Sequence, residues 1–477
     1  MTARCVMVLG TTSGAGKSWL ATALCRWYAR QGLKVAPFKA QNMSNNARVV
    51  AGGEIGSAQY FQALAARAEP DVRMNPLLLK PERDTHSQVV LLGQVDEALS
   101  RQSWRGRSAS VWPQVRDALD QLRAENDVVV IEGAGSPAEI NLKDSDIVNM
   151  RVALHTQARC LLVTDIDRGG AFAHLYGTWA LLPAEEQSLI RGFVLNKFRG
   201  DASLLAPAPQ RLQEITGIPT VATLPMWWQH GLPEEDGWYG APSPGGEGGK
   251  TVAIVAYPRI SNLDEFQPLA QVSGLRLKWV RSARELDDAD WIVLPGSKHT
   301  SSDLAWLRGQ HLDRAIAAHA AKGGAVLGVC GGLQMLGEAL VDTHGIDGNA
   351  PGLGLLPLVT QFEPDKTVRR TRATFGALQG EWAALSGVEV AGYEIHHGRT
   401  AQHPAMAAAL PVLPSALGWQ NAAGNVLGVY LHGLFEDANV LRALFGAQAP
   451  APDGVYDGLA DFIDRHFTPG VLQELIR

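Results

Sequence analysis

One cysteine stands between a short apolar run and two glycines, in the segment Val-Leu-Gly-Val-Cys-Gly-Gly-Leu-Gln at 326–334. This pattern is typical of a buried strand that turns sharply into a helix and projects the side chain at the turn, here Cys330. The free N–H groups at the start of such a helix favour an ionised thiolate, and the one on Gly331 is a candidate donor to an oxyanion. The segment therefore predicts a nucleophilic cysteine, against the alternative of a buried cysteine in an ordinary strand-to-helix turn.

A nucleophilic cysteine needs a base, and a histidine follows another apolar strand in Val-Leu-Gly-Val-Tyr-Leu-His-Gly at 426–433. Residues that are distant in sequence can meet at one edge of a parallel sheet, so His432 could serve Cys330. A histidine alone is more often a loop or core residue. Its pairing with the cysteine turn favours a catalytic role.

A second sharp turn, Pro-Gly-Ser-Lys-His-Thr at 295–300, follows the apolar strand 291–294. Its N–H groups, at Gly296 and Ser297, are candidates for the other half of an oxyanion hole. The strand Gly-Tyr-Glu-Ile-His-His-Gly at 392–398 could shape the same site or contact the other domain, and an ordinary strand with hydrogen-bonded histidines is an equal alternative.

Length and composition limit the classes of protein that the sequence can encode. The chain has 477 residues, of which 46% are apolar and 19% charged, which predicts two or three globular domains. A net charge of −6 argues against nucleic acid as a partner, and no apolar run is long enough for a membrane span. The four cysteines lie far apart, which favours a reducing, cytoplasmic location over a disulfide framework.

A phosphate-binding loop is predicted near the N-terminus. The apolar strand 4–9 precedes Gly-Thr-Thr-Ser-Gly-Ala-Gly-Lys-Ser at 10–18, and a helix is expected over 19–30. Consecutive N–H groups in such a loop surround phosphate oxygens, the lysine reaches the terminal phosphates, and the last hydroxyl can bind Mg²⁺. The alternative is a glycine-rich turn with a chance lysine. The predicted nucleotide-binding residues of this loop are Thr12, Gly14, Gly16, Lys17 and Ser18.

Other strand ends carry polar groups that could complete a site for ATP and Mg²⁺. The buried strand 127–131 ends at Glu132, where a carboxylate is well placed to hold Mg²⁺ together with Ser18. Asn196 and Lys197 follow the strand 192–195, where a nucleotide base edge could be read.

Candidate substrate contacts follow the second strand, 34–40, at Lys39, Gln41 and Asn42. Ligands of open α/β sheets bind at such strand ends, although a solvated loop of capping residues is an alternative. Asp146 is a further candidate on the substrate side, with a helix cap as its alternative. A helix is expected over 54–68, whose Glu54 and Gln59 face the same cleft or water.

Strands and helices alternate along the whole chain, which predicts the α/β class with two mostly parallel sheets, each covered by helices on both faces. The Gly- and Pro-rich segment 229–250 is the clearest linker. It divides the chain into domains at 1–228 and 251–477.

These motifs now resemble known families. Gly-x-Cys-x-Gly-x-Gln at 328–334 with the late His432 resembles class I glutamine amidotransferases, which have a flavodoxin-like fold. The resemblance implies that Cys330 attacks the side-chain amide of glutamine, forms a thioester and releases ammonia, and that Gln334 helps to hold the glutamine. The family usually carries a glutamate two residues after the histidine. Leu434 stands there instead, which suggests a dyad or an orienting group from elsewhere.

The N-terminal half resembles dethiobiotin synthetase-like ATP-dependent ligases, which have a P-loop NTPase-like fold, in its lengthened loop and in the strand ending Glu-Gly-Ala-Gly. The order of motifs over the whole chain resembles the corrinoid amidoligases of cobalamin biosynthesis. Relatives that make the a,c-diamide of cobyrinic acid usually show Gly-Pro-Asp after the second strand. Asn42 and Met43 stand here instead, which favours the cobyric acid branch and removes a carboxylate that those relatives offer to Mg²⁺.

The resemblance implies a function. ATP would phosphorylate a substrate carboxylate, and ammonia released from glutamine would convert the acyl phosphate to an amide. Free ammonia is mostly protonated near neutral pH, so a sheltered path between the sites is expected. The implied substrate is adenosylcobyrinic acid a,c-diamide, amidated at four peripheral carboxylates (b, d, e and g).

Two alternatives remain at this point: an amidoligase for another polycarboxylate, including the a,c-diamide synthase type, and a nucleotide-switched binding protein with an inactive amidotransferase domain. The absent glutamate at Leu434 is the main argument for the second. The sequence leaves open whether the chain forms a homodimer.

Overall fold

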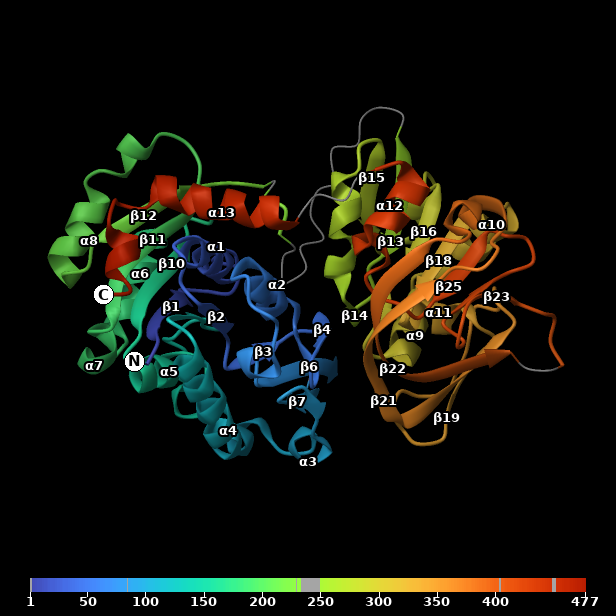
Figure 1. Ribbon diagram of the computed structural model, residues 1–477, viewed down its shortest axis with the longest axis horizontal. Coiled ribbons are helices and arrows are strands. Elements are labelled where there is room, and N and C mark those ends of the chain that lie inside the picture. The colour runs from blue at the N-terminus through green and yellow to red at the C-terminus, as the bar shows by residue number, and fades with distance from the viewer. Residues whose placement is uncertain (1, 84, 229, 233–248, 403–404, 448–451) are drawn as a thin grey trace.

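Six parallel strands form the central sheet of the N-terminal unit, in a computed structural model that describes residues 2–83, 85–228, 230–232, 249–402, 405–447 and 452–477 (Figure 1). In spatial order the strands are β12 (Thr220–Pro225), β11 (Ile190–Phe198), β10 (Arg159–Asp165), β1 (Arg4–Gly10), β9 (Val128–Glu132) and β2 (Val35–Phe38). Side chains alternate along β1, so Met7 and Leu9 enter one core while Val6 and Val8 enter the other. Both faces of this sheet are therefore buried, as expected for parallel strands.

Helices cover both faces of this sheet. The helical segments of the unit are α1 (Lys17–Arg30), α2 (Ser57–Ala65), η1 (Val72–Met74), α3 (Glu97–Ser100), α4 (Trp104–Glu125), η2 (Lys143–Ser145), α5 (Met150–Thr156), α6 (Ala171–Ala180), α7 (Ala184–Gln187), η3 (Ala202–Leu205) and α8 (Ala208–Thr216). The helix expected over 54–68 begins later, because Glu54 and Ile55 belong to a strand. That strand, β5 (Gly53–Gly56), pairs with β4 (Ala47–Val50) in an antiparallel hairpin.

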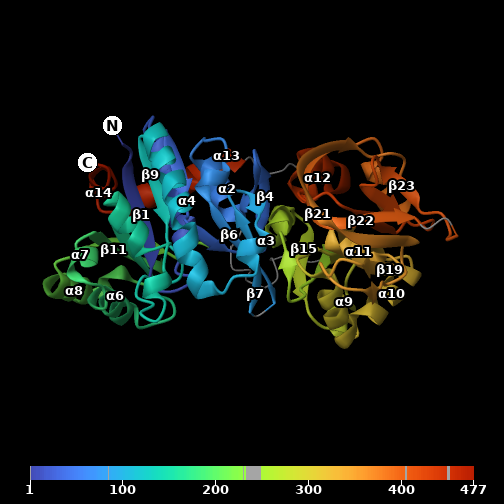
Figure 2. The same cartoon turned by 90° about the horizontal axis from the view of Figure 1, so that it is seen from below.

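A smaller sheet and the β4–β5 hairpin extend this unit towards the second one (Figure 2). The smaller sheet consists of β3 (Gln41–Met43), β6 (Leu77–Arg83), β7 (His86–Leu91) and β8 (Gln94–Val95).

The second unit has its own sheet of seven strands, of which the first five in spatial order are parallel. They are β15 (Leu275–Val280), β13 (Lys250–Val255), β16 (Trp291–Leu294), β18 (Ala325–Val329), β25 (Val426–Val429), β24 (Gly418–Gln420) and β23 (Leu410–Leu413). Its helical segments are η4 (Leu263–Gln271), η5 (Ala283–Leu286), α9 (Thr300–Gly309), α10 (Leu312–Ala321), α11 (Gly331–Leu336), η6 (Gly380–Leu385), η7 (Leu434–Glu436) and α12 (Ala438–Phe445). The two α/β units confirm the predicted fold class.

Two small sheets complete the second unit. One is built on two long antiparallel strands and contains β20 (Ala350–Pro351), β19 (Ala339–Asp342), β21 (Leu358–Thr374) and β22 (Glu389–Gln402). The other pairs β14 (Ile260–Ser261) with β17 (Gly296–Ser297), directly beside the cysteine turn.

The C-terminal end of the chain differs from the predicted domain division at 251–477. Helices α13 (Pro452–His466) and α14 (Val471–Glu474) pack on α1 in the core of the N-terminal unit (Figure 1). The buried Arg26 binds Asp457 at 2.7 Å, and the Tyr28 hydroxyl donates to the Leu472 carbonyl at 2.9 Å. The chain thus returns to its first unit after completing the second. Of the predicted linker 229–250, residues 229 and 233–248 lie outside the described residues.

None of the helices in the described part of the chain combines the length and apolar character that a bilayer span requires.

Candidate active sites

Cys330 lies at the turn between β18 and α11 and has φ 51° and ψ −103°, a conformation that L-residues rarely adopt. The flanking glycines are required by close approaches of the backbone. A Cβ on Gly332 would lie 1.9 Å from the Leu294 carbonyl oxygen, and one on Gly331 would lie 2.7 Å from the Ser297 nitrogen. The turn at 295–300 therefore packs directly against the cysteine turn, with Gly331 and Ser297 adjacent.

His432 approaches the cysteine from the end of β25 and is almost completely buried. Its Nδ1 lies 2.8 Å from Oε1 of Glu265, whose other carboxylate oxygen accepts from the Gly433 N–H at 2.7 Å. Burial alone would lower the pKa of His432, but the charge of Glu265 and the hydrogen-bonded Cys330 raise that pKa to about 10. An imidazolium at this position favours an ionised thiolate and holds a proton for a leaving amine.

Glu265 is the orienting group that Leu434 does not provide. It lies in η4, 167 positions before the histidine, and is completely buried. Glu265 stands at no characteristic spacing from Cys330 or His432, so the sequence motifs could not identify it. The only signal was the general expectation that such a histidine has a carboxylate partner.

We expect Glu265→Gln to lower kcat for glutamine hydrolysis about 100-fold or more, because the carboxylate that holds a catalytic histidine in its correct tautomer contributes up to about 10⁴-fold. Ammonia-dependent product formation is the control and should not change. An unchanged kcat for glutamine hydrolysis would contradict the assigned role.

The same variant should alter the pH dependence of stability. A histidine whose pKa is raised on folding, from 6.5 to about 10 here, stabilises the folded state fully below pH 6.5. That contribution is lost as the pH rises towards 10. The difference in unfolding free energy between wild type and Glu265→Gln should therefore be largest below pH 6.5 and shrink towards pH 10, as measured by denaturant titration.

Gln334 lies in α11 and is held by two hydroxyl groups. Its Oε1 accepts from Thr300 Oγ1 at 3.0 Å, and its Nε2 donates to Tyr430 at 3.4 Å. Gly296 lies against the histidine, since a Cβ on it would stand 2.7 Å from Cε1 of His432. All four predicted oxyanion and glutamine-binding residues thus surround Cys330 and His432.

The strand at 392–398 lies in β22 and borders the same site. Tyr393 stacks on the His432 ring, with 5.3 Å between ring centroids, and the Ile395 carbonyl lies 3.7 Å from Cys330 Sγ. His396 hydrogen-bonds the Gly398 carbonyl and Glu394, at 2.9 and 3.2 Å. The strand therefore shapes the site while its first histidine is held by ordinary strand contacts.

The phosphate-binding loop connects β1 to α1, as the motif predicts. Lys17 is buried and its Nζ donates to the carbonyls of Thr12 and Gly135, at 3.0 and 3.3 Å. Gly14 and Gly16 both have positive φ, which glycine adopts without strain. The loop leads into the N-terminus of α1, where free backbone N–H groups and the helix dipole favour an anion.

Asn196 and Lys197 support this loop in the present structure. Asn196 Nδ2 donates to the Ala15 carbonyl at 2.9 Å and stands where any Cβ on Gly16 would be. Lys197 Nζ donates to the Gly14 carbonyl at 2.9 Å. Both side chains lie at the predicted loop and contact its backbone, and Lys197 Nζ also lies 3.3 Å from the Asp165 carboxylate.

Glu132 is completely buried at the end of β9 and accepts four side-chain hydrogen bonds. Oε1 accepts from Ser18 and Lys39, each at 2.8 Å, while Oε2 accepts from Gln62 at 2.6 Å and Gln59 at 3.4 Å. Among the described residues, no group of three or more His, Cys, Asp or Glu side chains is arranged to hold a metal ion. Ser18 and Glu132 carry the oxygen atoms that Mg²⁺ prefers, and in this structure the Glu132 oxygen that faces Ser18 is also paired with Lys39.

The predicted substrate-side residues are divided between two places. Lys39 forms an ion pair with Glu132, with Nζ 2.8 Å from Oε1. Asn42 donates to the Gln59 side chain at 3.2 Å, and Gln41 is the first residue of the nearby strand β3. Asp146 does not cap the following helix, whose N-cap is Asn149; its Oδ1 accepts from the backbone N–H groups of residues 148 and 149 in the preceding turn, at 2.8 and 3.1 Å.

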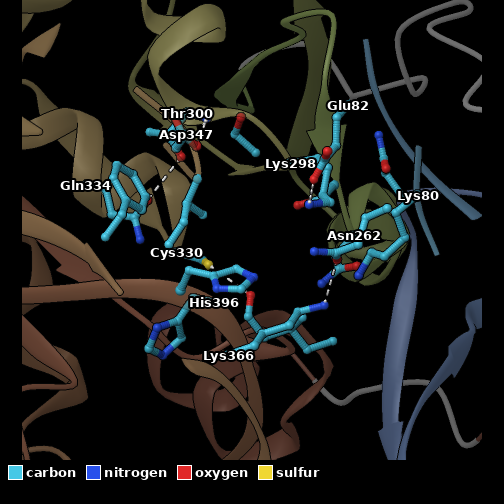
Figure 3. Close-up of a pocket in the computed structure, with 18 residues that line it drawn as sticks. Lys80, Glu82, Asn262, Lys298, Thr300, Cys330, Gln334, Asp347, Lys366 and His396 are labelled. Carbon is cyan, nitrogen blue, oxygen red and sulfur yellow. Dashed lines mark hydrogen bonds and ion pairs between the residues drawn. The ribbon is translucent and has the colours of Figure 1, made fainter. Parts of the chain in front are cut away.

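A pocket between the two units contains Cys330 and Gln334 on its amidotransferase side and Lys80 on the opposite side (Figure 3). The N-terminal unit supplies Asn45, Lys80, Glu82 and Gln88 to its wall. The nucleophile therefore faces a space whose far wall belongs to the nucleotide-binding half of the chain.

Ion pairs close this pocket across the interface. Glu54 is buried between Lys366 and Lys80, and Lys298 binds Glu82 at 2.6 Å. Burial lowers the pKa of Lys366 to about 7, and burial with two nearby lysines lowers the pKa of His397 to about 4. His397 is thus neutral at physiological pH, whereas the charge of Glu54 opposes the effect of burial on the pKa of Lys366 and favours the ion pair between them.

Comparisons with known proteins match both halves of the chain to protein families. Residues 6–230 match the CobQ/CobB/MinD/ParA nucleotide binding domain, and residues 251–440 match the CobB/CobQ-like glutamine amidotransferase domain. The fold and these matches define the chain as a nucleotide-binding domain joined to a glutamine amidotransferase domain.

Full-length relatives define the family more narrowly. A cobyric acid synthase of Variovorax paradoxus (strain S110) is 78% identical over 100% of both chains. Those of Polaromonas naphthalenivorans (strain CJ2) and Leptothrix cholodnii (strain ATCC 51168 / LMG 8142 / SP-6) are 75% and 66% identical, over at least 97% of each chain. The chain belongs to the cobyric acid synthase family, which confirms the predicted resemblance.

Proposed function

We propose that this protein uses ATP and glutamine to convert carboxylates of cobyrinic acid to amides in cobalamin biosynthesis. One observation carries the proposal: Cys330 faces a pocket whose opposite wall belongs to the nucleotide-binding unit. A glutaminase alone would not need that arrangement. The full-length similarity to cobyric acid synthases supports the substrate class.

The glutaminase reaction is assigned to Cys330 and His432. The thiolate attacks the side-chain amide carbon of glutamine, and N–H groups from Gly331 and the turn at Gly296 and Ser297 stabilise the oxyanion. His432 gives its proton to the departing nitrogen, which leaves as ammonia with formation of a glutamyl thioester. Water then hydrolyses the thioester to glutamate, with His432 as the base.

The second reaction is assigned to the N-terminal unit. A substrate carboxylate attacks the terminal phosphorus of ATP and forms an acyl phosphate and ADP, which makes the carbonyl carbon reactive towards ammonia. Lys17 would neutralise charge on the transferring group. Mg²⁺ held by Ser18 and Glu132 would offset the same charge when bound. Lys39 lies beside Glu132 and would orient the substrate carboxylate.

Ammonia must cross from one unit to the other without gaining a proton. The pocket at the interface supports a sheltered passage, because it begins at Cys330 and ends among residues of the N-terminal unit. A neutral His397 on its wall would not protonate ammonia.

The particular substrate and the domain boundaries can also be proposed. We propose adenosylcobyrinic acid a,c-diamide as the substrate, with amides formed at its b, d, e and g carboxylates. Residues 1–228 would form the ligase domain and 251–440 the amidotransferase domain, with the C-terminal helices returning to the ligase. The inactive-domain alternative loses its main argument, because Glu265 provides the missing carboxylate.

Mass spectrometry of the corrinoid product tests this proposal. After incubation with glutamine and ATP, we expect four successive exchanges of a hydroxyl for an amino group. The a,c-diamide and unamidated cobyrinic acid should be compared, together with polycarboxylates that lack the corrin ring. Amidation of the non-corrinoid acids alone would contradict the substrate assignment, and a product with only two new amides would contradict its extent.

A further inference from the structure

The β4–β5 hairpin of the N-terminal unit docks on the amidotransferase unit at the start of η4, the segment that carries Glu265. The Ala47 N–H donates to Asn262 Oδ1 at 2.9 Å, and the Leu263 N–H donates to Asn46 Oδ1 at 3.1 Å. These reciprocal bonds fix the hairpin to the residues immediately before the carboxylate that orients the catalytic histidine.

Arg48, the next residue of the hairpin, is buried in the amidotransferase unit with only 2% of its surface exposed. Its guanidinium binds both carboxylate oxygens of Glu436, at 2.6 and 2.7 Å, and also binds Asp264. Asp264 is adjacent in sequence to Glu265, and Glu436 lies in the turn that begins after His432. One cation from the ligase half therefore joins both segments of the glutaminase pair.

A ring contact provides a second connection. The Arg48 guanidinium lies 5.2 Å from the centroid of the Tyr393 ring, which stacks on His432. The backbones of Tyr393 and His432 also exchange two hydrogen bonds, at 3.1 and 2.9 Å. Movement of Arg48 would therefore disturb the face of the imidazole as well as its carboxylate partner.

The other end of the same segment reaches the nucleotide site. Strand β5 continues directly into α2, whose Gln59 and Gln62 bind Glu132. Gln62 also donates to the Ser18 carbonyl at 3.5 Å, and the ring of Phe61 lies 5.0 Å from the Arg48 guanidinium. Residues 46–62 thus contact the phosphate-binding loop at one end and the glutaminase at the other.

We propose that Arg48 is a positioning residue of the glutaminase, and that residues 46–62 couple glutamine hydrolysis to occupancy of the nucleotide site. This inference rests on the proposed function. A nucleotide and metal bound at Ser18 and Glu132 would change the hydrogen bonds of Gln59 and Gln62, and hence the position of α2 and the hairpin. Arg48 would pass that change to the Glu265–His432 pair.

Loss of Arg48 leaves Asp264 and Glu436 without their shared cation, next to the buried Glu265. Neighbouring carboxylates that share no cation repel one another, and the buried Asp264 would seek a new partner, so η4 should shift. Lysine carries the same charge but cannot bind two carboxylates in the planar geometry of a guanidinium, so Arg48→Lys should restore only part of the function.

The test compares Arg48→Gln and Arg48→Lys with Arg370→Gln in the full chain. Arg370 is the matched control, because its Nε binds the Val49 carbonyl of the same hairpin at 3.1 Å. Glutaminase kcat and KM are measured with and without ATP and corrinoid, and product formation is measured with ammonia in place of glutamine. In Arg48→Gln we expect stimulation of glutaminase kcat to fall about 10-fold or more, while ammonia-dependent synthesis stays near the wild-type rate.

Each outcome decides the proposal. Arg48→Lys should be intermediate and Arg370→Gln should retain the stimulation. Unchanged stimulation in Arg48→Gln, an equal loss in Arg370→Gln, or a parallel loss of ammonia-dependent synthesis in both Arg48 variants would overturn it. If wild type hydrolyses glutamine without any stimulation, the coupling is wrong but the proposed function stands. If wild type does not hydrolyse glutamine at all, the proposed function itself fails.

Discussion

Cys330→Ala should abolish glutamine hydrolysis, with a loss on the order of 10⁴-fold or more, because removal of a nucleophile eliminates the covalent route. The same variant should still form product when ammonia replaces glutamine, since Lys17, Ser18 and Glu132 are unaltered. Glutamate release and corrinoid mass should be measured on one preparation.

Cys5→Ala is the matched control, because Cys5 is a buried free cysteine of the other unit. It should retain both activities. Failure of Cys330→Ala to use ammonia, in a protein that still binds ATP, would contradict the division of labour between the two sites.

Lys17→Ala should have the opposite pattern. Removal of the buried cation at the phosphate-binding loop should lower product formation by about 10²- to 10³-fold, with glutamine and with ammonia alike, because the charge on the transferring phosphoryl group is no longer offset. Basal glutamine hydrolysis in the absence of ATP should remain. Lys34→Ala provides a control, as this exposed lysine precedes β2 at the opposite end of the sheet. A loss confined to the glutamine-dependent reaction would contradict the assignment of Lys17.

Cys330 and Lys17 could both be predicted from the sequence, because the chemistry of each depends on the residues next to it in the chain. A phosphate-binding loop needs several N–H groups in a row and a lysine at a fixed offset. A nucleophile turn needs small residues on either side of the cysteine, and the close approaches at Gly331 and Gly332 explain why glycine stands there. Such requirements appear directly as local patterns in the sequence.

The residues that contact His432 from distant parts of the chain could not be predicted in the same way. Glu265 and Arg48 reach His432 from segments that are 167 and 384 positions away, and neither stands in a spacing that signals a ligand or a base. The helix predicted over 54–68 also began too early, because its apolar positions continued into a strand whose Glu54 is buried between Lys80 of the same unit and Lys366 across the interface. In each case a tertiary contact outweighed the local pattern.

The C-terminal helices show the same limit at the level of domains. An amphipathic helix shows that one face is buried but does not show against which surface. Only the packing of α13 on α1, with Trp27 Nε1 donating to Asp464 at 2.8 Å, assigns this segment to the N-terminal unit. A division of the sequence into two domains at the linker therefore could not predict that the C-terminal helices belong to the N-terminal unit.

The central claim is that one chain releases ammonia at Cys330 and uses it at the ATP site without loss to solvent. The origin of the nitrogen in the product tests this claim most directly. The protein is incubated with ATP, the corrinoid substrate, glutamine labelled with ¹⁵N in its side-chain amide, and excess unlabelled ammonium, and the corrinoid amides are analysed by mass spectrometry. The account predicts that the new amides carry ¹⁵N almost exclusively. Amides labelled only in proportion to the mixed ammonia pool would contradict it.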